Sequence, residues 1–297
     1  MIIVPGPAST SLGEAVARRM GVEPLFINHK IFPDGENYIR VTGEVEGETV
    51  AFVQTTAPEP DRKLMQAFLL ARTLGDLGAR RVVAVIPYLA YARQDKRFLR
   101  GEALSLDVVL GLLEASGVSD LVVVDVHNEE SLSNLEKNHR LRVTNVSAVN
   151  LLAGYMRDTG FQGALSLSPD LGRRGVVEKA SKVLGGGMAF FEKTRDRVTG
   201  ETAITGGSVE VEGRDVVVFD DIISSGGTMS KAIQALRELG ARRVAAACTH
   251  VLPVPGAFER LRNAGAVRVV ATDTVESSYE TVSVAGLLAE ALQGLDR

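Results

Sequence analysis

The chain has 297 residues, of which 45% are hydrophobic and 24% are charged, and its formal net charge is −4. This composition excludes a disordered chain, and the length predicts two domains of ordinary size. The slightly acidic balance argues against a protein whose main role is nucleic-acid binding, since such a protein normally shows a basic face. It does not exclude a local basic pocket for a small polyanion.

The N-terminal sequence MIIVPGPAST lacks a basic leader and is interrupted by Pro5 and Pro7, so we expect no signal peptide. No apolar stretch approaches the ~18 residues of a membrane-spanning helix, so we expect no membrane partner. The single cysteine, Cys248, excludes disulfides within the chain and fits a cytoplasmic protein. Its apolar neighbours favour a small buried hydrophobe over the alternative, a nucleophile.

Three segments of the first half return in the second half, in the same order. The similar pairs are 46–56 (EGETVAFVQTT) and 212–222 (EGRDVVVFDDI), GARRV at 78–82 and at 240–244, and 117–125 (GVSDLVVVD) and 265–273 (GAVRVVATD). The spacing between the segments differs between the two copies. The sequence therefore predicts one structural unit that has been duplicated.

Each copy alternates short apolar runs with helical patterns. The runs Val50–Val53, Val82–Ile86 and Leu121–Val124 are typical of strands buried on both faces of a parallel sheet. Apolar stripes at helical spacing lie between the runs, at Leu64, Phe68, Ala71 and Leu74 and at Met229, Ile233, Leu236 and Leu239. We predict an α/β fold with two domains, 1–145 and 146–297, and a last helix that can pack back on the first domain.

The first half contains two polar segments, one in an expected turn and one after an expected strand end. The first is FPDGE at 32–36, and the second is PYLAYARQDKR at 87–97. Arg93 and Arg97 can pair with phosphate oxygens, and Gln94 can bind a base or ribose edge. The alternatives are a core position for Phe32 and a solvated basic turn for the arginines.

The segment after the apolar run 216–219 combines acids with a loop rich in glycine and hydroxyl groups. The loop Ser224, Ser225, Gly226, Gly227 and Thr228 offers backbone N–H groups at a helix start, which suits a phosphate. Asp220 and Asp221 suit neighbouring hydroxyl groups of a sugar. A ribose 5-phosphate meets both needs. The alternative is a structural turn with Thr228 as the helix N-cap.

The first copy carries TTAPEPDR at 55–62 in place of this loop. Pro58 and Pro60 lack backbone N–H donors, and Glu59 and Asp61 carry charge of the wrong sign for a phosphate. We therefore expect the first copy to keep the strand–loop–helix path without binding an anion.

These motifs resemble those of a known family. The segment 216–228 resembles the phosphoribosyl diphosphate motif of the phosphoribosyltransferases, and 32–36 and 87–97 resemble the nucleotide-binding motifs of ribose-phosphate pyrophosphokinases. The resemblance covers nearly the whole chain. It implies two tandem phosphoribosyltransferase-like domains, the first for ATP and the second for ribose 5-phosphate. It also implies transfer of the diphosphate group of ATP to the sugar's C1 hydroxyl, giving phosphoribosyl diphosphate and AMP for nucleotide biosynthesis.

The resemblance also implies roles for individual residues. ATP would contact Phe32, Asp34, Gly35, Glu36, Arg93 and Gln94, with Phe32 stacked on adenine. Ribose 5-phosphate would contact Asp220, Asp221 and the loop 224–228. Mg²⁺ would lie at His127 and Asp170, and Lys193 and Arg195 would be catalytic. Against these roles, a lone histidine is more often structural, and the charged stretch 192–207 can be an exposed hairpin.

Two rival functions share some of these features. A phosphoribosyltransferase would use the same 224–228 loop, but it gives no reason for the motifs at 32–36 and 87–97. An inactive regulatory subunit should have lost the metal or catalytic positions, which this chain keeps. The stretch 128–133 departs from the family's pattern after His127, so we expect allosteric inhibition by ADP to be weak or absent. We expect a homo-oligomer.

Overall fold

The chain forms two compact units in a computed structural model that describes residues 1–169, 174–195, 202–206 and 210–295, with 191–195 and 202–206 described by their backbone alone. The first unit comprises Met1–Ser147, Thr274–Glu276 and Ser283–Arg297, and the second comprises Ala148–Asp273 and Ser277–Val282. The predicted domain boundary after residue 145 falls inside a strand, close to the change of unit after Ser147.

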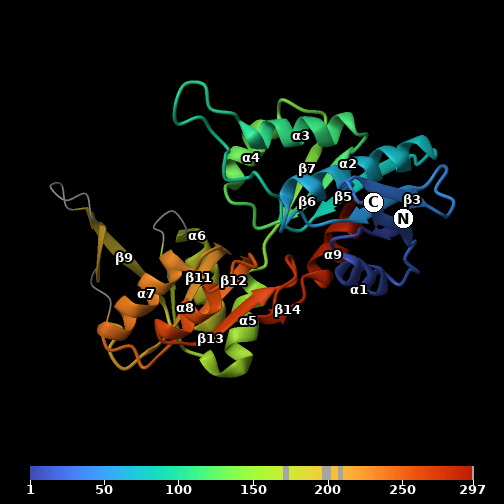
Figure 1. Ribbon diagram of the computed structural model, residues 1–297. Coiled ribbons are helices and arrows are strands. Elements are labelled where there is room, and N and C mark those ends of the chain that lie inside the picture. The colour runs from blue at the N-terminus through green and yellow to red at the C-terminus, as the bar shows by residue number, and fades with distance from the viewer. Residues whose placement is uncertain (170–173, 196–201, 207–209, 296–297) are drawn as a thin grey trace. The chain divides into compact units, whose positions relative to one another are not determined.

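The first unit is built on a parallel sheet with the strand order β1-β4-β5-β6-β7 (Figure 1). Its strands are β1 (Ile2–Pro5), β4 (Thr49–Val53), β5 (Arg81–Ile86), β6 (Asp120–Val124) and β7 (Arg142–Val146). Its helices are α1 (Thr10–Met20), α2 (Pro60–Asp76), α3 (Ser105–Ala115), α4 (Glu129–Glu136) and α9 (Ala285–Leu295). A separate antiparallel hairpin, β2 (Ile27–Ile31) and β3 (Asn37–Val41), packs against α2.

The second unit repeats this parallel sheet and extends it at one edge. Its strands β8 (Leu165–Ser168), β11 (Asp215–Ile223), β12 (Arg243–Val251), β13 (Ala266–Thr272) and β14 (Glu280–Val282) run parallel in that order. Beyond β8 lie β9 (Met188–Arg195), which is parallel to β8, and β10 (Thr202–Gly206), which is antiparallel to β9. The helices are α5 (Val149–Met156), which continues into the π-helical turn η1 (Arg157–Phe161), α6 (Arg174–Leu184), α7 (Gly227–Glu238) and α8 (Ala257–Asn263).

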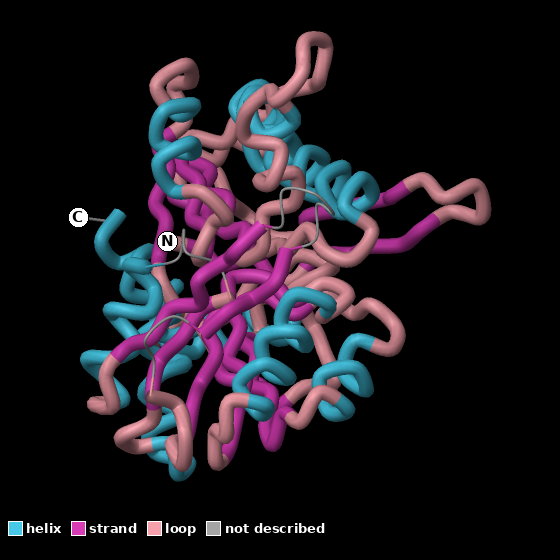
Figure 2. The backbone as a smooth tube through the Cα atoms, turned by 90° about the vertical axis from the view of Figure 1, so that its left-hand side faces the viewer, coloured by secondary structure: helices cyan, strands magenta, loops and turns pink. Residues whose placement is uncertain are grey.

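Helices cover both faces of the second sheet (Figure 2). Successive side chains of a strand point to opposite faces, so alternate residues belong to two different hydrophobic clusters. On one face, Val216 and Val218 pack with residues of α7 and α8. On the other face, Val217 and Phe219 pack with residues of α5 and α6. Strands that are buried on both faces explain why these segments read as continuous apolar runs.

The predicted duplication is confirmed by the backbone. The order β4-α2-β5-α3-β6 in the first unit matches β11-α7-β12-α8-β13 in the second. Even single hydrogen bonds repeat: the Gly47 N–H donates to the Gly78 carbonyl at 2.8 Å, and the Gly213 N–H donates to the Gly240 carbonyl at 2.9 Å. The two units therefore share one path through both their elements and their turns.

The last helix occupies in the first unit the place that α5 has in the second. In the second unit α5 packs against α6, the helix that follows the first strand of that sheet. In the first unit α9 packs against the corresponding helix, α1, and also contacts β7. Arg81 Nη1 donates to the Leu295 carbonyl at 2.7 Å at the end of α9. One unit is thus completed by a helix from the far end of the chain.

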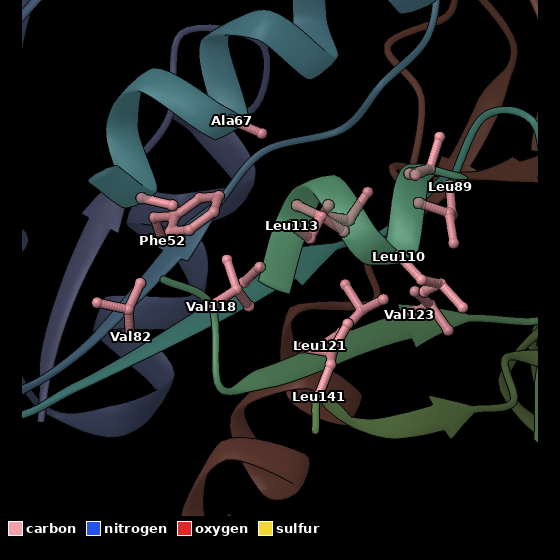
Figure 3. Packing of buried hydrophobic residues seen from close by; sticks show 14 of the residues in the cluster. Phe52, Ala67, Val82, Leu89, Leu110, Leu113, Val118, Leu121, Val123 and Leu141 are labelled. Carbon is pink, nitrogen blue, oxygen red and sulfur yellow. The ribbon is translucent and has the colours of Figure 1, made fainter. Parts of the chain in front are cut away.

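The core of the first unit lies between its sheet and the helices α2 and α3. Figure 3 shows Leu110 and Leu113 of α3 directed toward Leu121 and Val123 of β6. The predicted strand runs and the α2 stripe are confirmed by this burial. In α7 the prediction was wrong for Leu239, which follows the last helical residue as the C-cap and is 43% exposed.

The twin glycines after α2 and α7 provide a test of the repeat. Gly78 and Gly240 have φ of +83° and +82°, and an added Cβ would lie 3.1 Å from Glu46 Cγ and 3.2 Å from Glu212 Cγ. We expect Gly78→Ala and Gly240→Ala each to lower the free energy of unfolding of its own unit by about 1–2 kcal/mol, the cost of a left-handed alanine. Urea unfolding measures both.

Gly75→Ala is the control, because Gly75 is helical and an added Cβ meets nothing within 4 Å. This variant should be neutral or should stabilise the protein by up to about 1 kcal/mol. Equal losses of stability in all three variants would contradict the assignment of the twin positions.

Candidate functional site

The two aspartates lie at the carboxyl end of β11, at the edge where parallel sheets bind ligands. Asp220 is partly exposed, whereas Asp221 is 7% exposed. The Asp221 N–H donates to Asp220 Oδ1 at 2.9 Å. β11 continues to Ile223, so the acids belong to the strand, and Ile222 and Ile223 separate them from the loop.

Cys248 lies beside Asp220 on the neighbouring strand β12 and is fully buried. Burial raises the pKa of its thiol well above the ordinary value, and the charges of Asp220 and Asp221 raise it further. Its Sγ donates to the His250 carbonyl at 3.4 Å. The interpretation as a buried hydrophobe is confirmed, because a thiol held protonated in the core is not a nucleophile.

The loop after β11 enters α7 through a left-handed glycine. Gly226 is the N-cap with φ 75°, and its carbonyl accepts from the Ser230 N–H at 2.8 Å. Arg260 Nη1 holds the loop from outside by donating to the Ser225 carbonyl at 2.7 Å. The alternative with Thr228 as N-cap is wrong, since Thr228 lies inside the helix. Because glycine has no side chain, the cap residue leaves the first N–H groups of α7 open to an anion.

The start of α2 in the first unit follows the same backbone path as the start of α7, but its side chains differ. Its N-cap is Glu59, a non-glycine residue with φ 62°, and the Glu59 carbonyl accepts from the Lys63 N–H at 3.1 Å. Glu59 also pairs with Arg62. Lys63 Nζ donates to the Ala57 carbonyl at 2.6 Å, and burial lowers its pKa. Both cations at this helix start are thus engaged by the loop itself.

In the aligned repeat, Gln54, Thr55 and Thr56 occupy the positions of Asp220, Asp221 and Ile222. The side chains of these three residues of the first unit are buried. Thr55 Oγ1 donates to the Thr274 carbonyl at 2.7 Å. Thr56 Oγ1 donates to the Tyr88 carbonyl at 2.6 Å and accepts from the Ala90 N–H at 2.7 Å. The positions that carry acids in the second unit are therefore internal cross-links in the first.

The segment 32–36 forms the exposed turn of the β2–β3 hairpin. Phe32 is 38% exposed, so its interpretation as a core aromatic is wrong. Its ring lies edge-on to Tyr38 at 6.2 Å, and Lys30 Nζ lies 4.5 Å from the ring centre. The turn is shaped by Gly35, with φ +95°, and by Asp34 Oδ1, which accepts from the Glu36 N–H at 3.2 Å.

A side-chain hydrogen bond joins the loops after β5 and β6. Asn128 Nδ2 donates to Asp95 Oδ2 at 2.8 Å, while Asn128 Oδ1 caps α4 by accepting from the Ser131 N–H at 3.1 Å. Arg93 is exposed and Gln94 is half-buried just before Asp95. His127, which is half-buried, lies just before Asn128. The structure thus brings these three predicted residues to neighbouring loops of one sheet edge.

Three non-glycine residues in left-handed conformations follow β4, β5 and β6: Glu59, Tyr91 and Asp125, with φ of 62°, 66° and 37°. Such residues cost stability and cluster at functional sites. The sequence pattern did not indicate them, because none is a glycine or an asparagine. They mark the same edge as Arg93, Gln94 and His127.

Some predicted residues are not placed by the structure. Asp170 lies outside the described residues. Lys193 and Arg195 lie on β9, whose backbone pairs with β10 as a hairpin with Lys193 opposite Ile204, but their side chains are outside what is described. Within the described residues, no group of three or more His, Cys, Asp or Glu side chains could hold a metal ion. In the same residues, no helix is both long and apolar enough to cross a membrane.

The chain is similar to known proteins over its whole length. Residues 1–117 match the N-terminal domain of ribose phosphate pyrophosphokinase, and residues 171–286 match the phosphoribosyl transferase domain. The ribose-phosphate pyrophosphokinase of Methanothermobacter thermautotrophicus is 40% identical over 98% of this chain and 100% of its own. That of Saccharolobus solfataricus is 39% identical over 93% of each chain. This chain belongs to the ribose-phosphate pyrophosphokinase family.

A solved member of the family has the same fold. The crystal structure of phosphoribosylpyrophosphate synthetase from Mycobacterium smegmatis matches with a TM-score of 0.88 and 30% identity, covering 99% of this chain and 98% of that one. The predicted fold class, two tandem phosphoribosyltransferase-like domains that each contain a parallel sheet flanked by helices, is confirmed.

Gly226 provides a test of the loop after β11. An alanine at φ near +75° is strained, and its Cβ would lie 3.4 Å from the Ala257 carbonyl oxygen. We expect Gly226→Ala to weaken the binding of ribose 5-phosphate about tenfold, because the free loop relaxes from the left-handed conformation and binding must restore it at a cost of about 1–2 kcal/mol. Calorimetric titration measures the Kd.

The control is Gly213→Ala, in a remote turn of the same unit with φ +69° and open space around its Cβ position. Its backbone strain is similar, so its Kd for ribose 5-phosphate should be that of the parent. A tenfold loss in both variants would assign the effect to general destabilisation.

Proposed function

We propose that this chain transfers the diphosphate group of ATP to the C1 hydroxyl of ribose 5-phosphate, giving 5-phosphoribosyl 1-diphosphate and AMP. The observation that carries the proposal is the glycine-capped loop of α7 directly after Asp220 and Asp221, in a chain that belongs to the ribose-phosphate pyrophosphokinase family. The product would supply nucleotide biosynthesis.

The second unit would hold the sugar. The 5-phosphate would bind the backbone N–H groups of 224–228 at the positive end of α7, which is 12 residues long. The hydroxyl groups of Ser224, Ser225 and Thr228 can donate further hydrogen bonds to the phosphate oxygens. Asp220 and Asp221 would accept hydrogen bonds from the ring hydroxyls.

The first unit would hold the nucleotide. Phe32 presents an exposed ring for stacking on adenine, and Asp34, Gly35 and Glu36 complete the same turn. Arg93 and Gln94 are placed on the loop after β5, where a guanidinium can pair with phosphate oxygens. The neighbouring Lys63 does not compete for this role, because it is bound to its own loop.

In the transfer step, the C1 hydroxyl oxygen forms a bond to the β-phosphorus of ATP, and the bond from that phosphorus to the α-phosphate oxygen breaks. AMP leaves, and the hydroxyl proton passes to solvent. Such a step depends on positioning and on neutralisation of charge more than on covalent help from the protein. Lys193 and Arg195 would stabilise the negative charge on the transferred group.

We propose Mg²⁺ as the cofactor, held at His127 and Asp170. His127 follows the carboxyl end of β6 and is half-buried. Mg²⁺ keeps several waters and needs only one or two protein ligands, so this small donor set would suit it. When bound, the ion would neutralise phosphate charge.

The proposed setting is the cytoplasm, where a protein with one buried thiol and no disulfide is stable. We also propose a homo-oligomer. Exposed apolar side chains lie at i, i+4 spacing on two helices that contact each other, namely Met65 and Leu69 on α2 and Val108 and Leu112 on α3. Such a patch is typical of a protein interface.

The experiment that tests the function mixes the protein with Mg-ATP and ribose 5-phosphate and separates the nucleotides by chromatography. The proposal predicts AMP in equal amount to the ribose 5-phosphate consumed. Formation of ADP, or no turnover, would reject it. A phosphoribosyltransferase would leave ATP intact and would instead consume phosphoribosyl diphosphate with a nucleobase.

Lys193 is expected to act on the transition state. We predict that Lys193→Ala lowers kcat by at least ~100-fold, the scale of losing one strong electrostatic stabiliser. Steady-state assays of AMP formation measure this, with Lys182→Ala on the exposed face of α6 as the control that keeps the parent kcat. A normal kcat with a raised KM in Lys193→Ala would assign this lysine to substrate binding.

Asp221 is expected to distinguish the two substrates. Asp221→Ala should raise the KM for ribose 5-phosphate at least about tenfold, since one or two hydrogen bonds to a charged acceptor are lost. The KM for ATP should change less than twofold, because its motifs lie in the first unit. Equal losses for both substrates would show that the aspartate is structural.

A further inference from the structure

A buried chain of side-chain amides runs from the sheet of the first unit to the β2–β3 hairpin. The Ala8 N–H donates to Gln54 Oε1 at 3.0 Å. Gln54 Nε2 donates to Gln66 Oε1 at 2.9 Å. Gln66 Nε2 donates to Asn37 Oδ1 at 2.8 Å and lies 3.2 Å from His29 Nε2. This series of hydrogen-bonded amides therefore connects the residue after β4 with α2 and with both strands of the hairpin.

The two glutamines are almost fully buried, with Gln54 at 0% and Gln66 at 3% exposure. Buried polar groups are costly when they lack partners, so these amides specify one arrangement of the elements that they join. The Gln54 amide is also packed tightly, because a Cβ on Gly6 would lie 2.3 Å from Gln54 Oε1. Neither glutamine is among the site residues that the sequence indicated.

The inner face of the hairpin changes character along its length. At the base, Ile27 pairs with Val41, and both pack against the hydrophobic core of the unit, as does Ile39 in the middle of the hairpin. His29, opposite Ile39, and Asn37, the last paired residue before the turn, are the residues that meet Gln66. The hairpin belongs to neither large sheet, so apolar contact holds its base and the amide chain holds the half that ends in Phe32–Glu36.

We propose that Gln66 is a positioning residue for nucleotide binding, which acts by fixing the turn of the β2–β3 hairpin through Asn37 and His29. This inference rests on the proposed function, because it takes that turn as the adenine-binding element. Without the Gln66 amide, the hairpin stays attached at its base while its turn samples other positions. The apparent affinity for ATP then falls in proportion to the fraction of molecules with the turn in place.

The test compares Gln66→Leu with the parent enzyme. We expect the KM for ATP to rise about tenfold, the result of a competent fraction near one tenth. The kcat at saturating ATP and the KM for ribose 5-phosphate should change less than twofold. Gln234→Leu is the matched control, because Gln234 makes its amide contact with Glu238 on the exposed face of α7 and should change none of these values.

A second variant removes the hydrogen bond between Gln66 and Asn37 by changing Asn37, which is half-buried. Asn37→Leu removes one of the two hairpin partners of Gln66 and leaves His29 in place, so the KM for ATP should rise in the same direction, also where Gln66→Leu folds poorly. The double variant should lose less than the sum of the two single variants, because the hydrogen bond between Gln66 and Asn37 is absent from both. Additive losses in the double variant, or equal rises in both KM values, would overturn the proposal.

Hydrogen exchange without substrates separates this inference from the proposed function. In Gln66→Leu, amides of 29–37 should exchange faster while those of β4 and β5 keep the parent rates. A parent protein that forms no AMP but shows this pattern would reject the proposed function and retain the role of Gln66 in holding the hairpin. An active parent whose Gln66→Leu variant loosens the hairpin at an unchanged KM for ATP would reject the positioning role.

Discussion

Both units must turn from a buried strand into a helix at the edge of a parallel sheet, and both do so through an N-cap residue in the left-handed conformation. At Gly226 this conformation costs little and leaves the first N–H groups of α7 uncovered. At Glu59 the same conformation is strained, and the side chain supplies a carboxylate that pairs with Arg62. One backbone path therefore leaves N–H donors open for the proposed anion site in one unit and places a carboxylate at the same position in the other.

The divergence extends to the strand that precedes each turn. In the second unit β11 carries two carboxylates near its end that suit a sugar's hydroxyl groups. In the first unit the equivalent Gln54 and Thr55, together with the next residue Thr56, are buried cross-links. These cross-links hold the turn after β1, the residues near Thr274, the loop after β5 and the β2–β3 hairpin in place. The equivalent segment thus carries acids in one unit and supports neighbouring loops in the other.

The fold was largely predictable from the sequence because its signals are local and repeated. Apolar runs predicted the strands, and the repeated GARRV segment and its neighbours predicted the duplication. Thr228 was a wrong alternative as a cap, because the chain reaches its left-handed residue at Gly226, two positions earlier. Leu239 fits the helical period but lies past the last turn of α7. The roles of Gln54 and Gln66 and the packing of α9 against α1 depend on contacts between distant segments, which no local pattern contains.

We propose that ribose 5-phosphate binds the loop after β11 and that the loop after β4 does not bind it. A crystal structure of the protein with ribose 5-phosphate and a non-hydrolysable ATP analogue tests this assignment. We expect the sugar's phosphate on the backbone of 224–228, its hydroxyl groups at Asp220 and Asp221, and the purine ring against Phe32. An ordered phosphate of ribose 5-phosphate held by the backbone of 56–61 would contradict it.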